Sequence, residues 1–271
     1  MPDTPVPSTH AANSRLLRRN DGGVTTLTLN RPQQFNAISS DLLSELEAAL
    51  KSIAADAAAR VVVIAGAGAG KAFCACHDLK EMREHRDRDF IRDIFERCSR
   101  VMVNLTRLPQ PVIARVHGVA AAAGCQLVAQ CDLAIASTEA RFATSGVKYG
   151  IFCNTPGVPL ARDVGRKRAL EMLLTGEFID AETALTHGLV NRVVAPEWLD
   201  DEVATLARSI LDKTPLSVAA GKKIFYEQIE TGLERAYTLA NEAMTCSLMT
   251  EDAIEGIDAF SQKRPPQWKG K

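Results

Sequence analysis

The sequence predicts an α/β protein whose parallel strands are joined by crossover helices. The segment VTTLTLN (24–30) alternates apolar and polar residues, and RVVVIAG (60–66) is rich in β-branched residues, so both are expected to be strands. Between them, apolar side chains recur at helical spacing from Leu42 to Ile53. A strand, a helix and a strand in this order favour parallel pairing, because the helix returns the chain to the edge where it began.

The same alternation continues along the chain. The predicted elements are a helix that begins with Ser39, Ser40 and Asp41, a helix over about 87–106, a strand over 111–118, a small-residue helix from about 122, and strands over 132–137 and up to LVNRVV (189–194). The last third has helical patterns that are interrupted by turn signals. Pro215 is expected in the first turn of one of these helices, because its missing N–H has no partner to lose there.

Composition limits the possible functions. The chain has 271 residues, of which 46% are hydrophobic, and a formal net charge of −1, which gives no field to attract nucleic acid or an anionic membrane. Seven cysteines fit a reducing compartment better than a disulfide framework, and no metal site is expected. The sequence has no secretory signal, so we expect a cytoplasmic protein, or a mitochondrial matrix protein if its Ser- and Arg-containing start is a transit peptide.

Two segments combine small residues with the start of a helix. Residues 120–124 follow one strand, and the loop GAGAGKAFCACHDLKEM (66–82) follows another. Free backbone N–H groups at a helix start attract an oxyanion or a phosphate. An Ala/Gly run after a strand also serves close packing of the helix on the strand, and both explanations stay open at this point.

Five segments resemble the enoyl-CoA hydratase/isomerase, or crotonase, superfamily over about residues 15–270. These segments are LNRPQQFNAI (29–38), KAFCACHDLKEM (71–82), VIARVHGVAAAAGCQLVAQCDLAIAS (112–137), TPGVPLAR (155–162) and TEDAIEGIDAFSQKRPP (250–266). The resemblance implies a repeated ββα spiral core over 15–205 and a helical trimerisation region over 206–271. Residues 1–14 are expected to be a disordered N-terminus, and the protein is expected to form trimers or dimers of trimers.

The resemblance also implies the site. The backbone N–H groups of His77 and Ala123 would form the oxyanion hole that polarises the thioester carbonyl, with the His77 imidazole beside the CoA arm or titrating at the pocket mouth. Coenzyme A would enter as part of the substrate, with no other cofactor. Residues implied to contact CoA are Phe35, Ala37, Ala75 and, from a neighbouring subunit, Phe260 and Lys263.

Two departures from the family pattern bear on the chemistry. Gln126 and Gly146 stand where hydratases of the family have their two catalytic Glu residues, and Cys76 and His77 stand where the family has Gly and Ala. Each positioned acid or base contributes about 10²–10⁴ in rate, so the loss of both predicts weak or altered hydratase activity. Gly146 is also compatible with a backbone conformation that only glycine adopts readily.

Candidate replacements follow Gly146 in the sequence. Tyr149 and Cys153 are tentative acid–base groups, and the stretch GVKYGIFCN (146–154) resembles dihydroxynaphthoyl-CoA synthases, in which a Gly leaves room for a bicarbonate base. Three functions therefore stay open: a weak enoyl-CoA hydratase, an inactive protein that binds or senses CoA thioesters, and an isomerase, thioesterase or C–C lyase.

Overall fold

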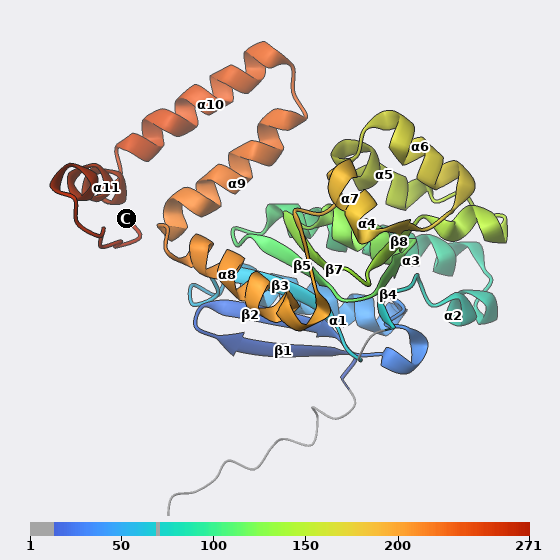
Figure 1. Ribbon diagram of the computed structural model, residues 1–271. Helices are drawn as coiled ribbons and strands as arrows, with labels where there is room; N and C mark the ends of the chain where they lie inside the picture. Colours follow the sequence, from blue (N-terminus) through green and yellow to red (C-terminus); the bar gives the residue numbers. More distant parts are fainter. Residues whose placement is uncertain (1–13, 69–70) are drawn as a thin grey trace, which may run out of the picture.

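A computed structural model describes residues 14–68 and 71–271 (Figure 1). Most of the predicted disordered N-terminus, and residues 69 and 70 of the glycine-rich loop, lie outside these ranges. The elements are β1 (Leu16–Asp21), β2 (Val24–Leu29), η2 (Pro32–Gln34), α1 (Ser40–Ala54), β3 (Val61–Gly66), β4 (Ala72–Cys74), α2 (Leu79–Glu84), α3 (Arg88–Arg107), β5 (Val112–Val116), β6 (Val119–Ala121), α4 (Ala123–Gln130), β7 (Leu133–Ser137), β8 (Arg141–Ala143), η3 (Ser145–Tyr149), α5 (Asn154–Asp163), α6 (Arg166–Thr175), β9 (Ile179–Asp180), α7 (Ala181–His187), β10 (Arg192–Val194), η4 (Pro196–Trp198), α8 (Leu199–Leu211), α9 (Pro215–Ile229), α10 (Leu233–Leu248) and α11 (Glu251–Gln262).

Two sheets form the core, and the predicted parallel pairing is confirmed. The larger sheet has the order β1-β2-β3-β5-β7-β10, in which β1 is antiparallel to β2 and the other pairs are parallel. The smaller sheet has the order β4-β6-β8-β9, with parallel pairs β4-β6 and β6-β8. The smaller sheet carries both segments that the sequence singled out as sites of free backbone donors.

The larger sheet is covered on both faces, which explains its β-branched strands. In β3, Val62 and Ile64 join a core with α1 and α3, whereas Val61 and Val63 face α8. The polar start of α1 is confirmed, because the Ser39 side chain accepts a hydrogen bond from the N–H of Leu42. Alternating residues of one strand thus fill two separate apolar layers.

The helix α8 crosses the boundary predicted at residue 205. Its buried residues Leu199, Val203 and Ala207 all pack on the larger sheet, so α8 belongs to the core along its whole length. Thr214 then caps α9, and Pro215 occupies the first turn of that helix, as predicted. The helical C-terminal region begins at α9 instead of at residue 206.

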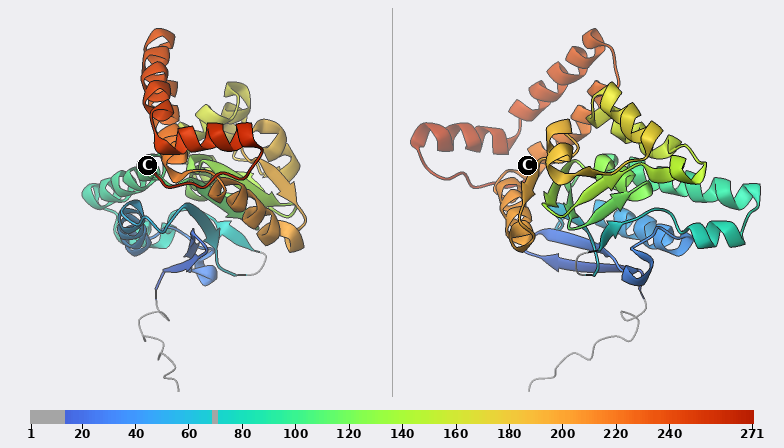
Figure 2. Two further views of the ribbon diagram at one scale, coloured as in Figure 1. Left: turned by 90° about the vertical axis from the view of Figure 1, so that its left-hand side faces the viewer. Right: turned by 45° about the vertical axis from the view of Figure 1, so that its right-hand side comes forward.

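The last three helices extend away from the sheets, as Figure 2 shows. A buried ion pair fastens α9 to the core: Lys222 Nζ lies 2.6 Å from Asp132 Oδ2 and also donates to the carbonyl oxygens of Leu105 and Gln110. The C-terminal tail returns to the start of α11, where the N–H of Lys269 donates to Asp252, and the same carboxylate accepts from the hydroxyl group of Thr214, the cap of α9. The region α9–α11 is therefore anchored at its base and exposed beyond it.

Candidate functional site

The ends of β4 and β6 bring the two predicted oxyanion-hole residues to one edge of the smaller sheet. Cys74 pairs with Ala120 in parallel register, so His77 and Ala123 each lie three residues beyond a paired position. Gly124 makes the close approach possible, because a Cβ at this position would lie 1.8 Å from the Cys74 carbonyl oxygen. The small-residue run thus serves close packing and, at the same time, places the start of α4 beside the loop that holds His77.

The backbone around His77 turns its N–H toward that same edge. The N–H of Ile38 donates to the Cys76 carbonyl (2.8 Å), and the N–H of Asp78 donates to the Ile38 carbonyl (2.9 Å). In extended backbone, successive N–H groups point to opposite sides. The His77 N–H is therefore directed away from Ile38.

The second donor depends on an unusual conformation of Ala122. This residue has φ 47° and ψ −112°, a region that strongly favours glycine, while its own N–H donates to the Ala143 carbonyl at 2.9 Å. The turn lets the chain enter α4 at Ala123. As the first residue of the helix, Ala123 has no carbonyl four residues back in the helix to accept its N–H.

The Cys76 side chain lies near both N–H groups. Burial raises the pKa of the Cys76 thiol, whereas the nearby N–H groups of His77 and Ala123 oppose that rise. The Cys76 side chain is half-buried. The structure thus brings the two residues of the predicted hole to one edge of the sheet, with the Cys76 side chain near both.

The His77 imidazole is not at a solvent-exposed pocket mouth, so the expectation that it titrates there is wrong. Its ring is buried and meets Phe95 of α3 edge to face, with 5.4 Å between the ring centroids. Burial lowers the pKa of His77 to about 4. Neither ring nitrogen makes a hydrogen bond of normal geometry within the described residues, although the Ile38 carbonyl is near enough to oppose the fall in pKa. The imidazole is a neutral packing group at pH 7.

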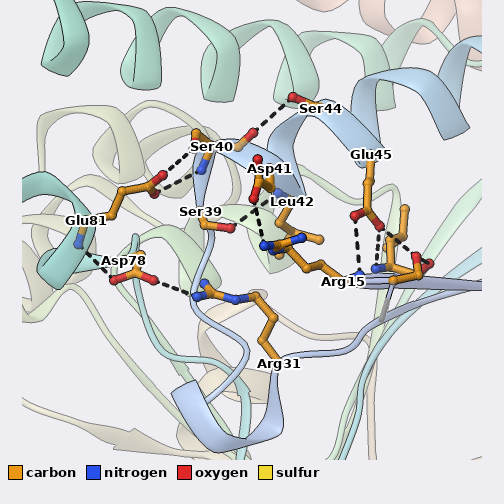
Figure 3. A network of polar contacts seen from close by, with 12 residues as sticks. Arg15, Arg31, Ser39, Ser40, Asp41, Leu42, Ser44, Glu45, Asp78 and Glu81 are labelled. Carbon is orange, nitrogen blue, oxygen red and sulfur yellow. Dashed lines mark hydrogen bonds and ion pairs between the residues drawn. The ribbon is translucent and has the colours of Figure 1, made fainter. Parts of the chain in front are cut away.

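A polar network, which the sequence reasoning missed, holds the His77 loop in place (Figure 3). Arg31 donates to Asp78 at 2.7 Å and to the Ala37 carbonyl at 2.7 Å. Burial acts to raise the pKa of Asp78, but the hydrogen bonds from Arg31 and from the first turn of α2 bring it below its usual value. Glu81 accepts from the N–H of Ser40. The network joins the His77 loop to the first turns of α1 and α2.

One part of this network was detectable in the sequence. Asp78 followed by Glu81 before a helix is typical of a capping box. Asp78 does cap α2, because its carboxylate accepts from the N–H groups of Lys80 and Glu81. Glu81, however, reaches across to α1 instead of back to its own helix, and local spacing could not indicate that.

Gln126 lies in the first turns of α4 and is only 3% exposed. Its side-chain Oε1 has no hydrogen-bond partner among the described residues. Gly146 lies in η3, where its N–H donates to Cys153 Sγ at 3.2 Å. Gly146 does not have a positive φ, so the expected glycine-only conformation is wrong. The reason for glycine is space, because a Cβ would lie 2.5 Å from the Ile151 carbonyl oxygen and 2.7 Å from Cys153 Sγ.

The two tentative acid–base groups occupy different surroundings. Tyr149 is 68% exposed at the end of η3, so its hydroxyl group is on a solvated surface. Cys153 is buried at the start of α5, and burial raises the pKa of its thiol, while the Gly146 N–H opposes the rise. A thiol that stays protonated at pH 7 is a poor base.

The predicted CoA contacts fall into two groups. Phe35, Ala37 and Ala75 lie together, since the N–H of Ala75 donates to the Phe35 carbonyl and the Phe35 side chain is half exposed. Phe260 and Lys263 end α11, which Figure 1 shows on the far side of the molecule from α2 and the His77 loop. One chain therefore does not bring the two groups together.

The positive charge at the end of α11 is partly neutralised by an ion pair. Arg264 pairs with both carboxylate oxygens of Glu255, at 2.6 and 2.8 Å, which offsets its charge. Lys263 makes no ion pair in the part of the chain that the structure describes. Of Lys263 and Arg264, only Lys263 therefore keeps its positive charge unpaired among the described residues.

The sequence matches a known family and is similar to known proteins over most of its length. The sequence model of the enoyl-CoA hydratase/isomerase family matches residues 19–271. The human enoyl-CoA hydratase domain-containing protein 3, mitochondrial, is 46% identical over 246 residues, which cover 91% of this chain and 80% of that protein. The probable enoyl-CoA hydratase of Rhizobium meliloti is 35% identical and covers 94% of this chain and 97% of its own length.

A solved structure is also similar over nearly the whole chain. The crystal structure of an enoyl-CoA hydratase from Mycobacterium smegmatis has a TM-score of 0.92 and 54% identity, covering 94% of this chain and 99% of that chain.

Among the helices of the described residues, none has the length and apolar character needed to cross a membrane. All seven cysteines are free thiols.

Proposed function

Because the chain belongs to the enoyl-CoA hydratase/isomerase family, we propose that it binds an acyl-CoA or enoyl-CoA thioester and polarises the thioester carbonyl with the N–H groups of His77 and Ala123. The observation that carries the proposal is the parallel register of β4 and β6, which places His77 and Ala123 each three residues beyond the Cys74–Ala120 pair, with Gly124 packed closely against Cys74. Fixed backbone donors in a site that excludes water stabilise the negative charge that develops on the oxygen of a thioester enolate.

The proposed enzyme hydrates enoyl-CoA weakly. Addition of water to a double bond needs a base for the water and an acid for the α-carbon. Neither α4 nor η3, the two elements that hold Gln126 and Gly146, contains a carboxylate. The neutral His77, the protonated Cys153 and the solvent-exposed Tyr149 offer no evident replacement.

A second candidate function is binding of CoA thioesters without turnover, as in a carrier or sensor. The buried Gln126 side chain favours it, because its unpartnered Oε1 is a neutral acceptor that can hold a ligand but cannot titrate. Both candidates predict CoA binding, and turnover separates them.

The experiment that tests the proposal combines binding and turnover. Thermal unfolding is measured with CoA, acetyl-CoA, butyryl-CoA and crotonyl-CoA, and hydration of crotonyl-CoA is followed in parallel. We expect the acyl thioesters to stabilise the protein more than free CoA does, and crotonyl-CoA hydration to be a trace of ordinary enzyme rates. Stabilisation without any turnover favours the second candidate; no stabilisation by any thioester contradicts both.

We also propose that the site is completed by a neighbouring subunit in a trimer or a dimer of trimers. Large apolar side chains exposed on α10 and α11 are Leu233, Tyr237, Met244, Leu248, Ile254, Ile257 and Phe260. So much exposed apolar surface on two projecting helices is typical of an interface. A monomer in light scattering at micromolar concentration would contradict this assembly.

Phe260 and Lys263 test the shared site directly. Phe260→Ala and Lys263→Ala should each weaken CoA binding several-fold without unfolding the single chain, since Phe260 is 86% exposed there. For localisation, we propose the cytoplasm or the mitochondrial matrix, because the seven thiols are free and the human relative is named mitochondrial.

A further inference from the structure

The residues that follow α11 connect this helix to the junction between α8 and α9. Two residues of α11 are buried within the single chain, so its own side chains give it little attachment to the rest of the protein. Residues 264–271, which we call the return segment, run back along α11 toward α8 (Figure 2). The N–H of Gln267 donates to Glu255, and the N–H of Lys269 donates to Asp252. The return segment and α11 therefore lie antiparallel to each other.

Asp252 joins three parts of the chain at one carboxylate. This residue is in the first turn of α11 and is buried. It accepts hydrogen bonds from the N–H groups of Lys269 (2.7 Å) and Gly270 (3.0 Å), and from the hydroxyl group of Thr214, which caps α9. Hydrogen bonds to an ionised acceptor are stronger than those between neutral groups. Asp252 thus fixes the start of α11 to the start of α9.

Trp268 supplies a second attachment. Its Nε1 donates to the carbonyl oxygen of Asp212, the C-cap of α8, at 2.8 Å. Its ring lies against Gly256 of α11, where a Cβ would be 3.3 Å from the ring. Because Trp268 contacts both helices, the return segment holds α11 at a fixed distance from α8.

The same contacts fix the rotation of α11 about its own axis. Four residues of α11 that contact the return segment recur at spacings of three and four: Asp252, Glu255, Gly256 and Ala259. Residues at these spacings share one face of a helix. The exposed side chains of Ile254, Ile257 and Phe260 lie on the other side. With one face held by the return segment, the exposed apolar face has a single direction.

We propose that Asp252 and Trp268 are positioning residues for the CoA site, because they orient α11 so that Phe260 and Lys263 reach the ligand of the neighbouring subunit. The inference rests on the proposed function and adds to it the residues that act through α11. Without the return segment, α11 is joined to the rest of the chain only through Met249 and Thr250, which follow α10. A loosely held contact group must be ordered when the ligand binds, and this ordering lowers affinity.

The nucleotide end of CoA is the part that α11 should sense. It carries the phosphates, which attract the ammonium group of Lys263, and an adenine, on which the Phe260 ring can stack. Butyryl-pantetheine has the same thioester as butyryl-CoA but lacks this end. A change that only moves α11 should therefore weaken binding of butyryl-CoA and leave binding of butyryl-pantetheine unaffected.

The experiment measures dissociation constants of both ligands on the full-length natural protein and on Asp252→Ala, Asp252→Asn, Trp268→Ala and Trp268→Phe. Asp258→Asn is the matched control, since Asp258 is an exposed acid of α11 without an ion pair among the described residues. Phe260→Ala is measured beside them as a direct test of the shared site. Light scattering gives the oligomeric state of each variant.

We expect Asp252→Ala and Trp268→Ala to weaken butyryl-CoA binding about tenfold, and butyryl-pantetheine binding by less than about twofold. Asp252→Asn and Trp268→Phe should lose less, because the amide keeps an acceptor oxygen and the phenyl ring keeps the contact with Gly256. They keep the test valid if the alanine variants do not fold. Asp258→Asn should bind both ligands as the natural protein does.

The outcomes separate the inference from the proposed function. Butyryl-CoA binding that Phe260→Ala weakens and the Asp252 and Trp268 variants leave unchanged overturns the inference alone. Equal losses for both ligands overturn it as well, because the residues then support folding in general. Loss of the assembly in Asp252→Asn and Trp268→Phe also overturns it, since the return segment would then hold the subunits together. No binding of either ligand by the natural protein overturns the proposed function and the inference with it.

Discussion

The N–H of Gly146 donates a hydrogen bond to Cys153 Sγ at 3.2 Å, which brings η3 against the start of α5. This contact leaves no room for a side chain at 146, where the Ile151 carbonyl oxygen is even closer to a built Cβ than the sulfur is. The absence of a carboxylate at position 146 therefore reflects the course of the backbone as well as the identity of one residue.

Gly146→Ala should lower the free energy of unfolding by about 2–3 kcal/mol, because backbone atoms cannot move aside as a flexible side chain can. Gly146→Glu should lower the free energy of unfolding by a similar amount. It should not restore crotonyl-CoA hydration, even when it is combined with Gln126→Glu. Chemical denaturation measures the loss. Gly221→Ala is the control, since its Cβ would meet no atom within 4 Å in α9, and it should be neutral or slightly stabilising. Equal stability of Gly146→Ala and the natural protein would contradict the steric argument.

Ala122→Gly should stabilise the protein by about 1 kcal/mol. Release of the strain at φ 47° and ψ −112° outweighs the loss of a methyl group and the greater freedom of the unfolded chain. Ala121→Gly, one residue earlier in β6, has no such strain and should destabilise by about 1 kcal/mol. A destabilised Ala122→Gly variant would show that the conformation carries no strain.

The buried His77 makes stability depend on pH. Its pKa is lowered to about 4 in the folded protein, below the ordinary value of 6.5, so the folded state binds fewer protons than the unfolded state. The stabilisation is complete above about pH 6.5 and is lost as pH falls toward 4, by about 3 kcal/mol. His77→Gln should flatten the curve of unfolding free energy in that range. An unchanged pH dependence in His77→Gln would exclude His77 as the cause.

Lys222→Met should lower the free energy of unfolding by about 3–5 kcal/mol, because it leaves the carboxylate of Asp132 buried without its cation. Tyr226→Phe removes one hydrogen bond to the same carboxylate and should cost about 1 kcal/mol. Lys223→Met, whose lysine is 76% exposed, is the matched control and should stay within about 0.5 kcal/mol. Thermal or urea unfolding compares the three.

Gln126→Glu should raise crotonyl-CoA hydration by up to about 10²-fold, since it returns one proton-transfer group at nearly equal volume. Burial without a partner raises the pKa of the new carboxyl above its unfolded value, so the variant is most stable at low pH and loses stability as pH rises through that pKa. The rate of crotonyl-CoA hydration and the free energy of unfolding are measured between pH 5 and 8. Ordinary hydratase rates in the natural protein that Gln126→Ala leaves unchanged would mean that other groups carry the chemistry.

The sequence by itself determined the fold class and the family. Strand and helix periods, the strand-to-helix order and five ordered motifs predicted the crotonase-type fold, and the family match over residues 19–271 together with the Mycobacterium smegmatis structure confirms it. These features are local, because periodicity and turn chemistry act over a few residues. That positions 126 and 146 carry no carboxylate could also be stated from residue identity alone.

Only the tertiary structure decided what surrounds those residues. The parallel register of β4 and β6 brings His77 and Ala123, 46 residues apart in the chain, to one edge of the smaller sheet. Arg31 reaches Asp78 from another loop. The burial of His77 against Phe95 and the crowding at Gly146 likewise depend on segments brought together by sheet register and helix packing. A single sequence does not encode such long-range geometry in any local pattern, because the contacts form only when separate elements pack into one core.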